Sequence, residues 1–353
     1  MNGNYPFPDQ QILENLRKGV VIPAHPLALK KNRELDEKRQ KGLTRYYIEA
    51  GAGGIAVGVH TTQFEIHNPE AGLYKPVLEI SMEAVKEYGV ENKLVKVAGI
   101  CGKTSQAVKE AEIARSSGYD AGLLSLTELK EETENQIIEH AKEVARVIPL
   151  FGFYLQHSLG GRFLSSDFWC KFFEIENVIA VKIATFDRYT TIDVVRALLE
   201  TEKEKEIALY TGNDDNIIFD LITPFKVKGR EVNIVGGLLG HWAFWTKKSV
   251  EIFNEVKEIV NDKKPVPPHI LTLAAEITDA NGAIFDAKNN FAGCIPGINE
   301  VLRRTGLLEG NWCLNPDEKL SPGQKEEIDR IYQMYPHLRD DEFVRENIER
   351  FLS

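Results

Sequence analysis

Short apolar runs alternate with polar turns and amphipathic segments over most of the chain. Eight of these runs have the length and composition of strands that are buried on both faces, as in a parallel sheet covered by helices. The predicted strands span residues 20–23, 54–59, 96–100, 121–126, 149–154, 178–184, 206–210 and 231–236.

Apolar residues with helical spacing fill the segments between the runs, for example at 33–50, 105–117, 133–147, 165–174, 191–202 and 242–260. Eight strand–helix units in about 240 residues are typical of a (β/α)8 TIM barrel. An open, doubly wound sheet is the alternative, but it needs no eighth strand, and no Gly-x-Gly-x-x-Gly turn follows the first strand. The pattern therefore favours the barrel, which is an α/β fold.

The pattern changes after Asn261. A proline-rich break at 263–268 is followed by helical segments near 270–285, 298–304, 323–335 and 340–352, with no predicted strand between them. We therefore predict a catalytic barrel domain at residues 1–261 and a C-terminal helical extension at residues 262–353 that packs on the barrel.

Composition and charge narrow the class of protein. The formal net charge of −10 argues against nucleic acid or an anionic membrane as a partner. No apolar run is long enough to cross a bilayer, and residues 1–10 lack the residue order of a signal peptide. The four cysteines lie far apart without Cys-x-x-Cys spacing, which indicates reduced thiols and a cytoplasmic location.

Lys182 is the most unusual residue of the predicted strands, because it lies in the middle of the apolar run at 178–184. Side chains alternate along a strand, so Ala180 and Ala184 share its face, while the bulkier residues at 179, 181 and 183 face the helices. Burial is expected to lower the pKa of this amine and to make it a nucleophile. The alternative is that Lys182 pairs with a carboxylate or extends to solvent from the strand end.

Tyr154 ends the preceding strand, and adjacent strands bring it close to Lys182. Gly152 is expected on its face, with Phe151 and Phe153 on the other, so that the tyrosine points into the barrel. A phenol beside a nucleophilic amine can relay protons while a carbinolamine forms and collapses. Considered alone, such a tyrosine is more often a core aromatic residue with a satisfied hydroxyl group.

Further polar residues follow the predicted strands, at the end of the barrel where active sites of this fold gather. Thr61 and Thr62 offer hydroxyl groups and backbone amides to a carboxylate, although capping of the strand end is the simpler explanation for either alone. His25, His60 and His241 follow neighbouring strands, which leaves a metal-dependent enzyme as an alternative, but no His-x-His or His-Glu-x-x-His spacing supports it. The remaining candidates for substrate binding are Gln63, His157 and Gly212.

These residues resemble the dihydrodipicolinate synthase/N-acetylneuraminate lyase family of class I aldolases, over residues 20 to about 332. Thr61 and Thr62 stand where that family has Gly-Thr-Thr-Gly-Glu. Tyr154, with Gly161 seven positions later, matches the family's Tyr-Asn-x-Pro-x-x-x-Gly, and Lys182 follows twenty-eight positions after the tyrosine. The Gly-Asn-Asp-Asp turn at 212–215 resembles the family's Gly-Asp-Asp turn.

The resemblance implies a Schiff base between Lys182 and pyruvate or another 2-keto acid, and hence a lyase or synthase that makes or breaks a carbon–carbon bond. It implies proton transfer by Tyr154 and a carboxylate site at Thr61 and Thr62. It further implies that no cofactor is needed and that the protein is a homo-oligomer, either a dimer or a tetramer. A dehydratase or hydrolase that uses the same Schiff base and a catalytically silent relative that binds keto acids are the alternatives.

Departures from the family pattern bear on the substrate. Gln63 and Phe64 replace the glycine and glutamate after the two threonines, and Leu-Gln-His at 155–157 replaces Asn-x-Pro. Leu159 stands where dihydrodipicolinate synthases place an arginine for their second substrate, and the tyrosines that those enzymes lend to a neighbouring subunit are missing at 127–130. Condensation with aspartate semialdehyde is therefore not expected. A different keto acid is expected instead, with additional acids or bases at His25, His60 and His157.

Overall fold

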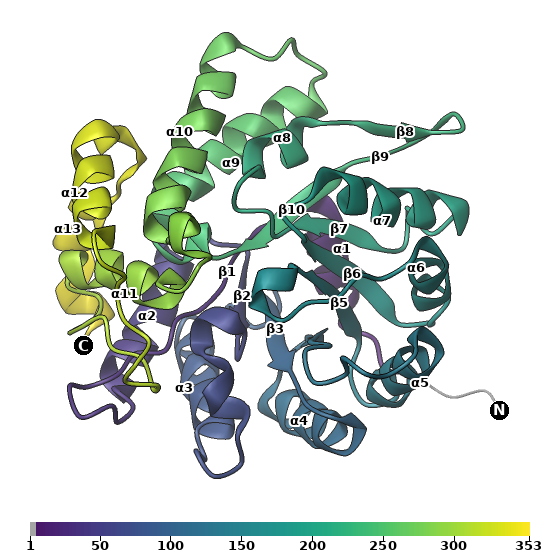
Figure 1. Ribbon diagram of the computed structural model, residues 1–353, viewed down its shortest axis with the longest axis horizontal. Helices are drawn as coiled ribbons and strands as arrows, with labels where there is room; N and C mark the ends of the chain where they lie inside the picture. The colour runs from purple at the N-terminus through teal and green to yellow at the C-terminus, as the bar shows by residue number, and fades with distance from the viewer. Residues whose placement is uncertain (1–4) are drawn as a thin grey trace.

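The structure, a computed structural model, describes residues 5–353 and contains eight parallel strands wound into a barrel (Figure 1). Neighbouring strands follow the order β1-β10-β7-β6-β5-β4-β3-β2. A parallel bridge between Ala24 and Ala56 joins the two ends of this order, and the His25 N–H donates to the Ala56 carbonyl at 2.8 Å. The predicted (β/α)8 barrel is therefore confirmed. Its strands are β1 (Val21–Pro23), β2 (Gly54–Val57), β3 (Val95–Ile100), β4 (Ala121–Leu124), β5 (Leu150–Leu155), β6 (Val178–Ala184), β7 (Ala208–Thr211) and β10 (Ile234–Leu239).

Helices cover the outside of the barrel, as the apolar spacing predicts. The alternation is least regular after β7, where the short α8 (Ile217–Ile222) and a hairpin of β8 (Phe225–Val227) and β9 (Arg230–Val232) precede the last barrel strand. This hairpin, which the sequence pattern did not predict, is the reason why β10 begins later than the predicted run. Within residues 5–353, no helix combines the length and the apolarity needed to cross a membrane. The other covering helices are α2 (Glu37–Ala50), α3 (Tyr74–Glu87), α4 (Thr104–Ser117), α5 (Glu134–Ala145), α6 (Ser166–Phe173), α7 (Arg188–Glu200) and α9 (Thr246–Asn261).

The helix α1 (Gln10–Lys18), which was also not predicted, closes the amino-terminal end of the barrel. Its residues Ile12, Leu13 and Leu16 are buried and belong to the same apolar cluster as the side chains inside the barrel. The Tyr210 hydroxyl group donates to the Leu16 carbonyl at 2.8 Å and so ties the helix to β7. Bulky side chains therefore fill this end, and space for a ligand lies at the carboxyl ends of the strands.

The side chains of β5 face the opposite way from the prediction. Phe153 pairs in register with Lys182 and lies in the interior cluster, whereas Tyr154 lies among the residues under the helices. The physical reason is Gly152, because a Cβ atom at this position would meet Phe172 of α6 at 2.7 Å. The glycine makes room for the aromatic layer of α6, so Tyr154, which shares its face, points away from the barrel interior.

The prediction for β6 is confirmed for Val181 and Ile183, which pack under the helices, on the face opposite Lys182. Ile179 is the exception, because the register between β5 and β6 shifts at this point and its side chain joins the interior cluster. The small residues Ala180 and Ala184 also belong to that cluster, as expected from their place beside the lysine.

The C-terminal extension packs against the barrel helices, on the yellow and light green side of Figure 1. The Asp340 carboxylate accepts hydrogen bonds from the Tyr46 hydroxyl group of α2 at 2.7 Å and from the Lys247 N–H of α9 at 2.9 Å. The domain boundary between residues 261 and 262 stays a prediction. The helices of the extension are α10 (Pro268–Ile284), α11 (Cys294–Thr305), α12 (Gln324–Met334) and α13 (Asp341–Phe351).

Candidate active site

Lys182 lies on β6 inside the barrel, and its side chain is only 8% exposed. Its amine is 4.8 Å from the centre of the Phe153 ring on the adjacent strand. Gly212, at the end of β7, leaves the space that the lysine occupies, because a Cβ atom there would meet the Lys182 Cε atom at 2.5 Å. The predicted position of Lys182 in the barrel interior is therefore correct, and Gly212 serves to accommodate it.

The Lys182 amine opens into a pocket at the carboxyl ends of the strands. The pocket has about 540 Å³ of empty space, which includes space that is open to solvent. Strand ends, the loops that follow them, and the extension all contribute to its wall. The lining residues are Ala24, Val59, His60, Thr61, Phe153, Leu155, Gln156, Leu159, Lys182, Ala184, Phe186, Gly212, Asp214, Gly240, Phe285, Phe291, Cys294 and Ile298.

Asp214 is the second ionisable group of this pocket, and it was missing from the residues predicted to bind substrate. Burial lowers the pKa of the Lys182 amine, although the negative charge of Asp214 acts in the opposite direction. Burial likewise raises the pKa of the Asp214 carboxyl group. Two interactions lower this pKa: the His241 N–H donates to the carboxylate at 2.9 Å, and the positive charge of Lys182 stabilises its ionised form. The sequence could have predicted that Asp214 lies near Lys182. The turn at 212–215 follows β7, and β7 is the neighbour of β6, which carries the lysine.

His60 and Thr61 also line the pocket, as predicted for substrate binding. Burial, assisted by the charge of Lys182, lowers the pKa of His60 to about 4, so its imidazole is neutral at pH 7. The Thr61 hydroxyl group donates to the Ala24 carbonyl at 2.8 Å, which leaves its oxygen lone pairs as acceptors.

Thr62 and Gln63 do not line the pocket, and their role in substrate binding stays a prediction. The Thr62 hydroxyl oxygen accepts the N–H groups of residues 58 and 59 and donates to the His25 carbonyl at 2.6 Å, so it holds the turn after β2. The Gln63 backbone has a φ of 70°, and its side-chain oxygen accepts the Leu314 N–H of the extension at 2.6 Å. The left-handed backbone at this position is one that glycine adopts readily.

His25, His157 and His241 lie outside the pocket lining, and the predicted roles of His25 and His157 stay predictions. The ring of His25 contacts the Thr44 hydroxyl group at 2.9 Å, and His157 is exposed on a short 3-10 turn. The ring of His241 contacts the Asn281 side chain at 2.7 Å. The part of the chain that the structure describes contains no group of three or more His, Cys, Asp or Glu side chains arranged to hold a metal ion. Among the described residues, the structure therefore does not gather His25, His60 and His241 into such a group, and the metal-dependent enzyme stays an alternative.

Tyr154 is also absent from the pocket that contains Lys182. Its hydroxyl group accepts the Leu164 N–H at 3.2 Å and donates to the Leu164 carbonyl at 3.4 Å, and its ring lies 5.2 Å from that of Trp169. Phe153, which has no acidic proton, takes the place beside the lysine. The structure therefore places the Tyr154 hydroxyl group against the Leu164 backbone and not in the pocket of Lys182, and proton transfer by Tyr154 stays a prediction.

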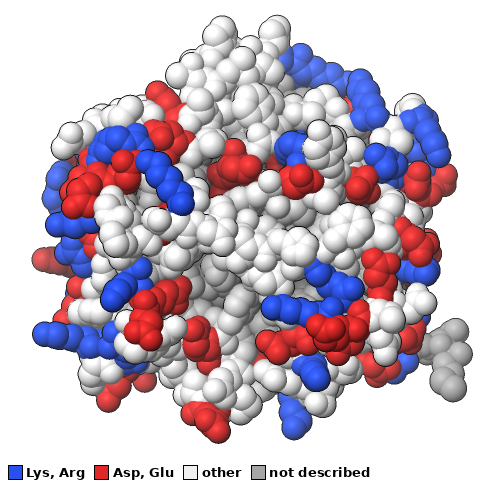
Figure 2. Space-filling model, viewed as in Figure 1, with Lys and Arg blue, Asp and Glu red and all other residues white. Residues whose placement is uncertain are grey.

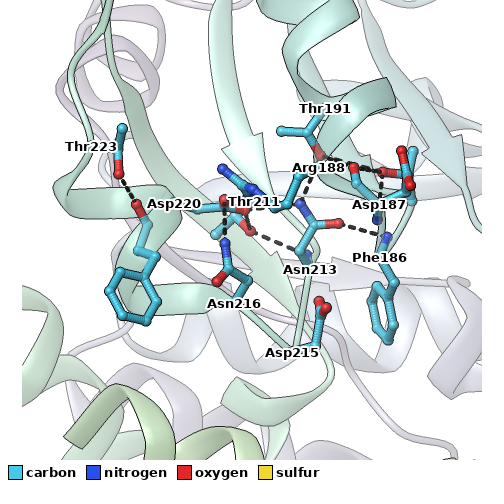
Figure 3. A network of polar contacts seen from close by, with 12 residues as sticks. Phe186, Asp187, Arg188, Thr191, Thr211, Asn213, Asp215, Asn216, Asp220 and Thr223 are labelled. Atoms are coloured by element: carbon cyan, nitrogen blue, oxygen red, sulfur yellow. Dashed lines mark hydrogen bonds and ion pairs between the residues drawn. The ribbon is translucent and has the colours of Figure 1, made fainter. Parts of the chain in front are cut away.

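A polar network, shown in Figure 3, holds together the loops after β6 and β7. The buried Asp220 carboxylate of α8 accepts the Thr211 hydroxyl group at 2.6 Å and the Asn213 amide at 2.9 Å. It also pairs with Arg188. The Asn213 side-chain oxygen in turn accepts the Phe186 N–H at 2.9 Å. The network therefore fixes the loop that carries Phe186 into the wall of the pocket.

The fold and the site together define a (β/α)8-barrel protein with a buried lysine and a partly buried carboxyl group in one pocket at the carboxyl ends of its strands. The profile of the Dihydrodipicolinate synthetase family matches residues 18–229, more than half of the chain. The chain belongs to this family, as the resemblance of its motifs indicated.

Known proteins are similar to the chain at low identity. A 4-hydroxy-tetrahydrodipicolinate synthase of Thiobacillus denitrificans is 26% identical over 198 residues, which are 55% of this chain and 61% of the relative. The chain thus matches about three fifths of the length of this relative. A dihydrodipicolinate synthase structure from Oceanobacillus iheyensis has a TM-score of 0.72 at 18% identity, covering 92% of this chain and 99% of the other. For an N-acetylneuraminate lyase from Fusobacterium nucleatum complexed with pyruvate the TM-score is 0.70 at 18% identity, with 91% and 98% covered.

Proposed function

We propose that this protein is a Schiff-base-forming lyase or synthase of the class I aldolase type, which acts on pyruvate or another 2-keto acid. The observation that carries the proposal is the Lys182 amine, which is buried in an open pocket and has a lowered pKa. An uncharged amine is a nucleophile toward a ketone, and its imine can accept electrons without a metal. Family membership and the pyruvate complex of the Fusobacterium nucleatum lyase support the proposal.

In the proposed reaction, the Lys182 amine attacks the C2 carbonyl of the keto acid. Loss of water from the carbinolamine leaves a protonated imine, which accepts the electron pair of the C3–C4 bond when a 4-hydroxy keto acid is cleaved. The proton of the C4 hydroxyl group goes to a base, an aldehyde leaves, and the resulting enamine regains a proton at C3. Water then releases the keto acid. The synthase direction is the reverse, and a dehydratase or hydrolase shares the imine-forming step.

We infer that Asp214 transfers these protons in place of a tyrosine. It shares the pocket with Lys182, and its raised pKa suits a group that both accepts and donates a proton near neutral pH. Neutral His60 and the Thr61 hydroxyl oxygen lie in the same pocket, and we assign them to binding the carboxylate and the carbinolamine.

We also propose a cytoplasmic location and a homo-oligomer. All four cysteines are unpaired in the structure, which suits a reducing compartment. The proposed oligomer rests on the family resemblance alone, and sedimentation of the purified protein will measure it. A monomer at micromolar concentration would contradict it.

Reduction with borohydride in the presence of pyruvate tests the proposed function. The intact wild-type protein is expected to gain the mass of one reduced pyruvate adduct, and Lys182→Ala is expected to gain none. Lys96→Ala is a matched control, because Lys96 is also buried on a barrel strand but pairs with Asp120 at 2.9 Å. This control should trap pyruvate like the wild type. A wild-type protein that binds pyruvate but forms no adduct would instead be a catalytically silent relative.

A further inference from the structure

The wall of the pocket beyond Lys182 is largely apolar. Four phenylalanines contribute to it from three different parts of the chain: Phe153 on β5, Phe186 after β6, and Phe285 and Phe291 in the extension. Lys182 and Asp214 are the charged side chains among the lining residues, apart from histidine. Figure 2 shows the same character at the surface, since the charged side chains on this face gather toward its rim and its centre is largely white.

Phe186 and Phe291 pack against each other across the pocket, with ring centres 5.5 Å apart and an angle of 74° between the rings. Edge-to-face packing of this kind is favourable, and both residues line the pocket. One ring comes from the loop that follows the lysine strand, and the other comes from the extension. The pair therefore joins the two parts of the chain above the reacting amine.

The backbone at both phenylalanines is left-handed, with φ of 51° at Phe186 and 65° at Phe291. A bulky residue rarely adopts this conformation, and it persists only where the surrounding structure holds it. Asn213 accepts the Phe186 N–H, as Figure 3 shows, and the Phe291 N–H donates to the Asp286 carbonyl at 3.0 Å. Unfavourable backbone conformations of this kind tend to occur at functional sites, which points to a role for the two rings in binding.

We propose that the natural keto acid carries an apolar, preferably aromatic, group that binds against the Phe186–Phe291 pair. This inference rests on the proposed function, because it places the keto group at Lys182 and the apolar group beyond it. A second carboxylate on the substrate would find no arginine and no second lysine among the lining residues, and Leu159 lines the wall. A polyhydroxylated tail would lose its water contacts against phenylalanine rings without new hydrogen bonds.

Borohydride trapping with three keto acids tests the inference on the whole protein. The half-saturating concentration for adduct formation is measured with pyruvate, 4-phenyl-2-oxobutanoate and 2-oxoglutarate. The phenyl compound should saturate at a concentration at least about tenfold lower than pyruvate, which is the discrimination that an apolar pocket achieves for a group of this size. The dicarboxylate should be no better than pyruvate.

Two variants test whether the Phe186–Phe291 pair causes the preference for the phenyl compound. Phe291→Ala and Phe186→Ala should each reduce the ratio between pyruvate and the phenyl compound toward one. Phe7→Ala is a matched control, because Phe7 is 50% exposed and lies before α1, at the opposite end of the barrel. Melting temperatures of all variants verify that they are folded.

The outcomes separate this inference from the proposed function. If pyruvate forms an adduct at Lys182 but 2-oxoglutarate binds more tightly than the phenyl compound, the apolar substrate class is wrong and the Schiff base stands. The same holds if Phe291→Ala and Phe186→Ala leave the ratio unchanged. If no keto acid forms an adduct, pyruvate included, the proposed function fails, and this inference falls with it.

Discussion

Burial acts in opposite directions on the pKa values of the two ionisable groups beside the proposed reaction centre. It disfavours charge on both the Lys182 amine and the Asp214 carboxyl group, so it lowers the pKa of the first and raises that of the second. The amine is thereby able to attack a carbonyl, and the carboxyl group is able to hold a proton near neutral pH. Because each charge favours the other, removing one group must shift the pKa of its partner.

Asp214→Asn tests this coupling. The negative charge of Asp214 raises the pKa of Lys182, so its removal should lower that pKa further and move the rise of the trapping rate to lower pH. The maximal rate should nevertheless fall by roughly 10²–10⁴-fold, because the proton-transfer group is lost. The rate of borohydride trapping, measured from pH 5 to pH 10, reports both effects.

Asp215→Asn is the control for this prediction, since Asp215 is the exposed neighbour that does not line the pocket. Its maximal trapping rate should match that of the wild type, because the Asp214 carboxyl group remains, while loss of the Asp215 charge should lower the pKa of Asp214. An unchanged maximal rate in Asp214→Asn would show that another group transfers the proton.

At the scale of single elements, the face of β5 decides which aromatic residue meets the lysine. The small residue Gly152 accommodates Phe172 of α6, and this directs Phe153 into the barrel and Tyr154 toward the helices. A one-residue difference of register along a strand therefore exchanges a phenol for a phenyl ring at the amine. The loss of a phenol at this place is consistent with the proposed role of Asp214.

Tyr154→Phe should leave the trapping rate of pyruvate unchanged and lower the free energy of unfolding by about 1 kcal/mol, because it removes the hydrogen bonds to the Leu164 backbone. Urea unfolding measures the stability. Tyr119→Phe is a matched control, since this buried hydroxyl group donates to the Leu78 carbonyl at 3.1 Å, away from the pocket. A tenfold slower trapping in Tyr154→Phe, but not in Tyr119→Phe, would show that Tyr154 takes part in the reaction.

At the scale of the whole molecule, the extension completes the pocket of the barrel. Phe285, Phe291, Cys294 and Ile298 all come from the chain beyond α9 and line the site beside Lys182. The extension is joined to the barrel helices by the buried Asp340, which accepts hydrogen bonds from α2 and α9. The stability of this contact therefore affects the site as well as the fold.

Asp340→Ala should lower the free energy of unfolding by about 1–3 kcal/mol, because it leaves buried donors of Tyr46 and Lys247 without an acceptor. Asp317→Ala, at an exposed position of the same extension, should change it by less than about 0.5 kcal/mol. Urea unfolding of both variants measures the difference. Equal losses in the two variants would contradict the assigned role of Asp340.

Most of the barrel was predictable from the sequence, because buried strands and amphipathic helices leave different apolar periods in the chain. The short α8 and the hairpin of β8 and β9 were not, since each is too short for a distinct period. The helix α1 was also not predicted, because the start of the chain is polar. Its apolar residues are explained only by the closed barrel, whose end they fill.

The site was predictable in part. Lys182, His60, Thr61 and Gly212 follow from their places in or after strands, and they do meet in one pocket. The orientation of Tyr154 was not predictable by alternation alone, because it depends on the contact of Gly152 with Phe172 of α6, twenty residues further along the chain. The aromatic run of α6 was the signal that a small residue faces outward on β5.

Peptide mapping of the adduct formed by pyruvate and borohydride tests the central claim most directly, because it shows which lysine has reacted. At limiting pyruvate, we expect the reduced adduct on the peptide that contains Lys182. An adduct distributed over the exposed lysines, or located on another buried lysine such as Lys96, would contradict it.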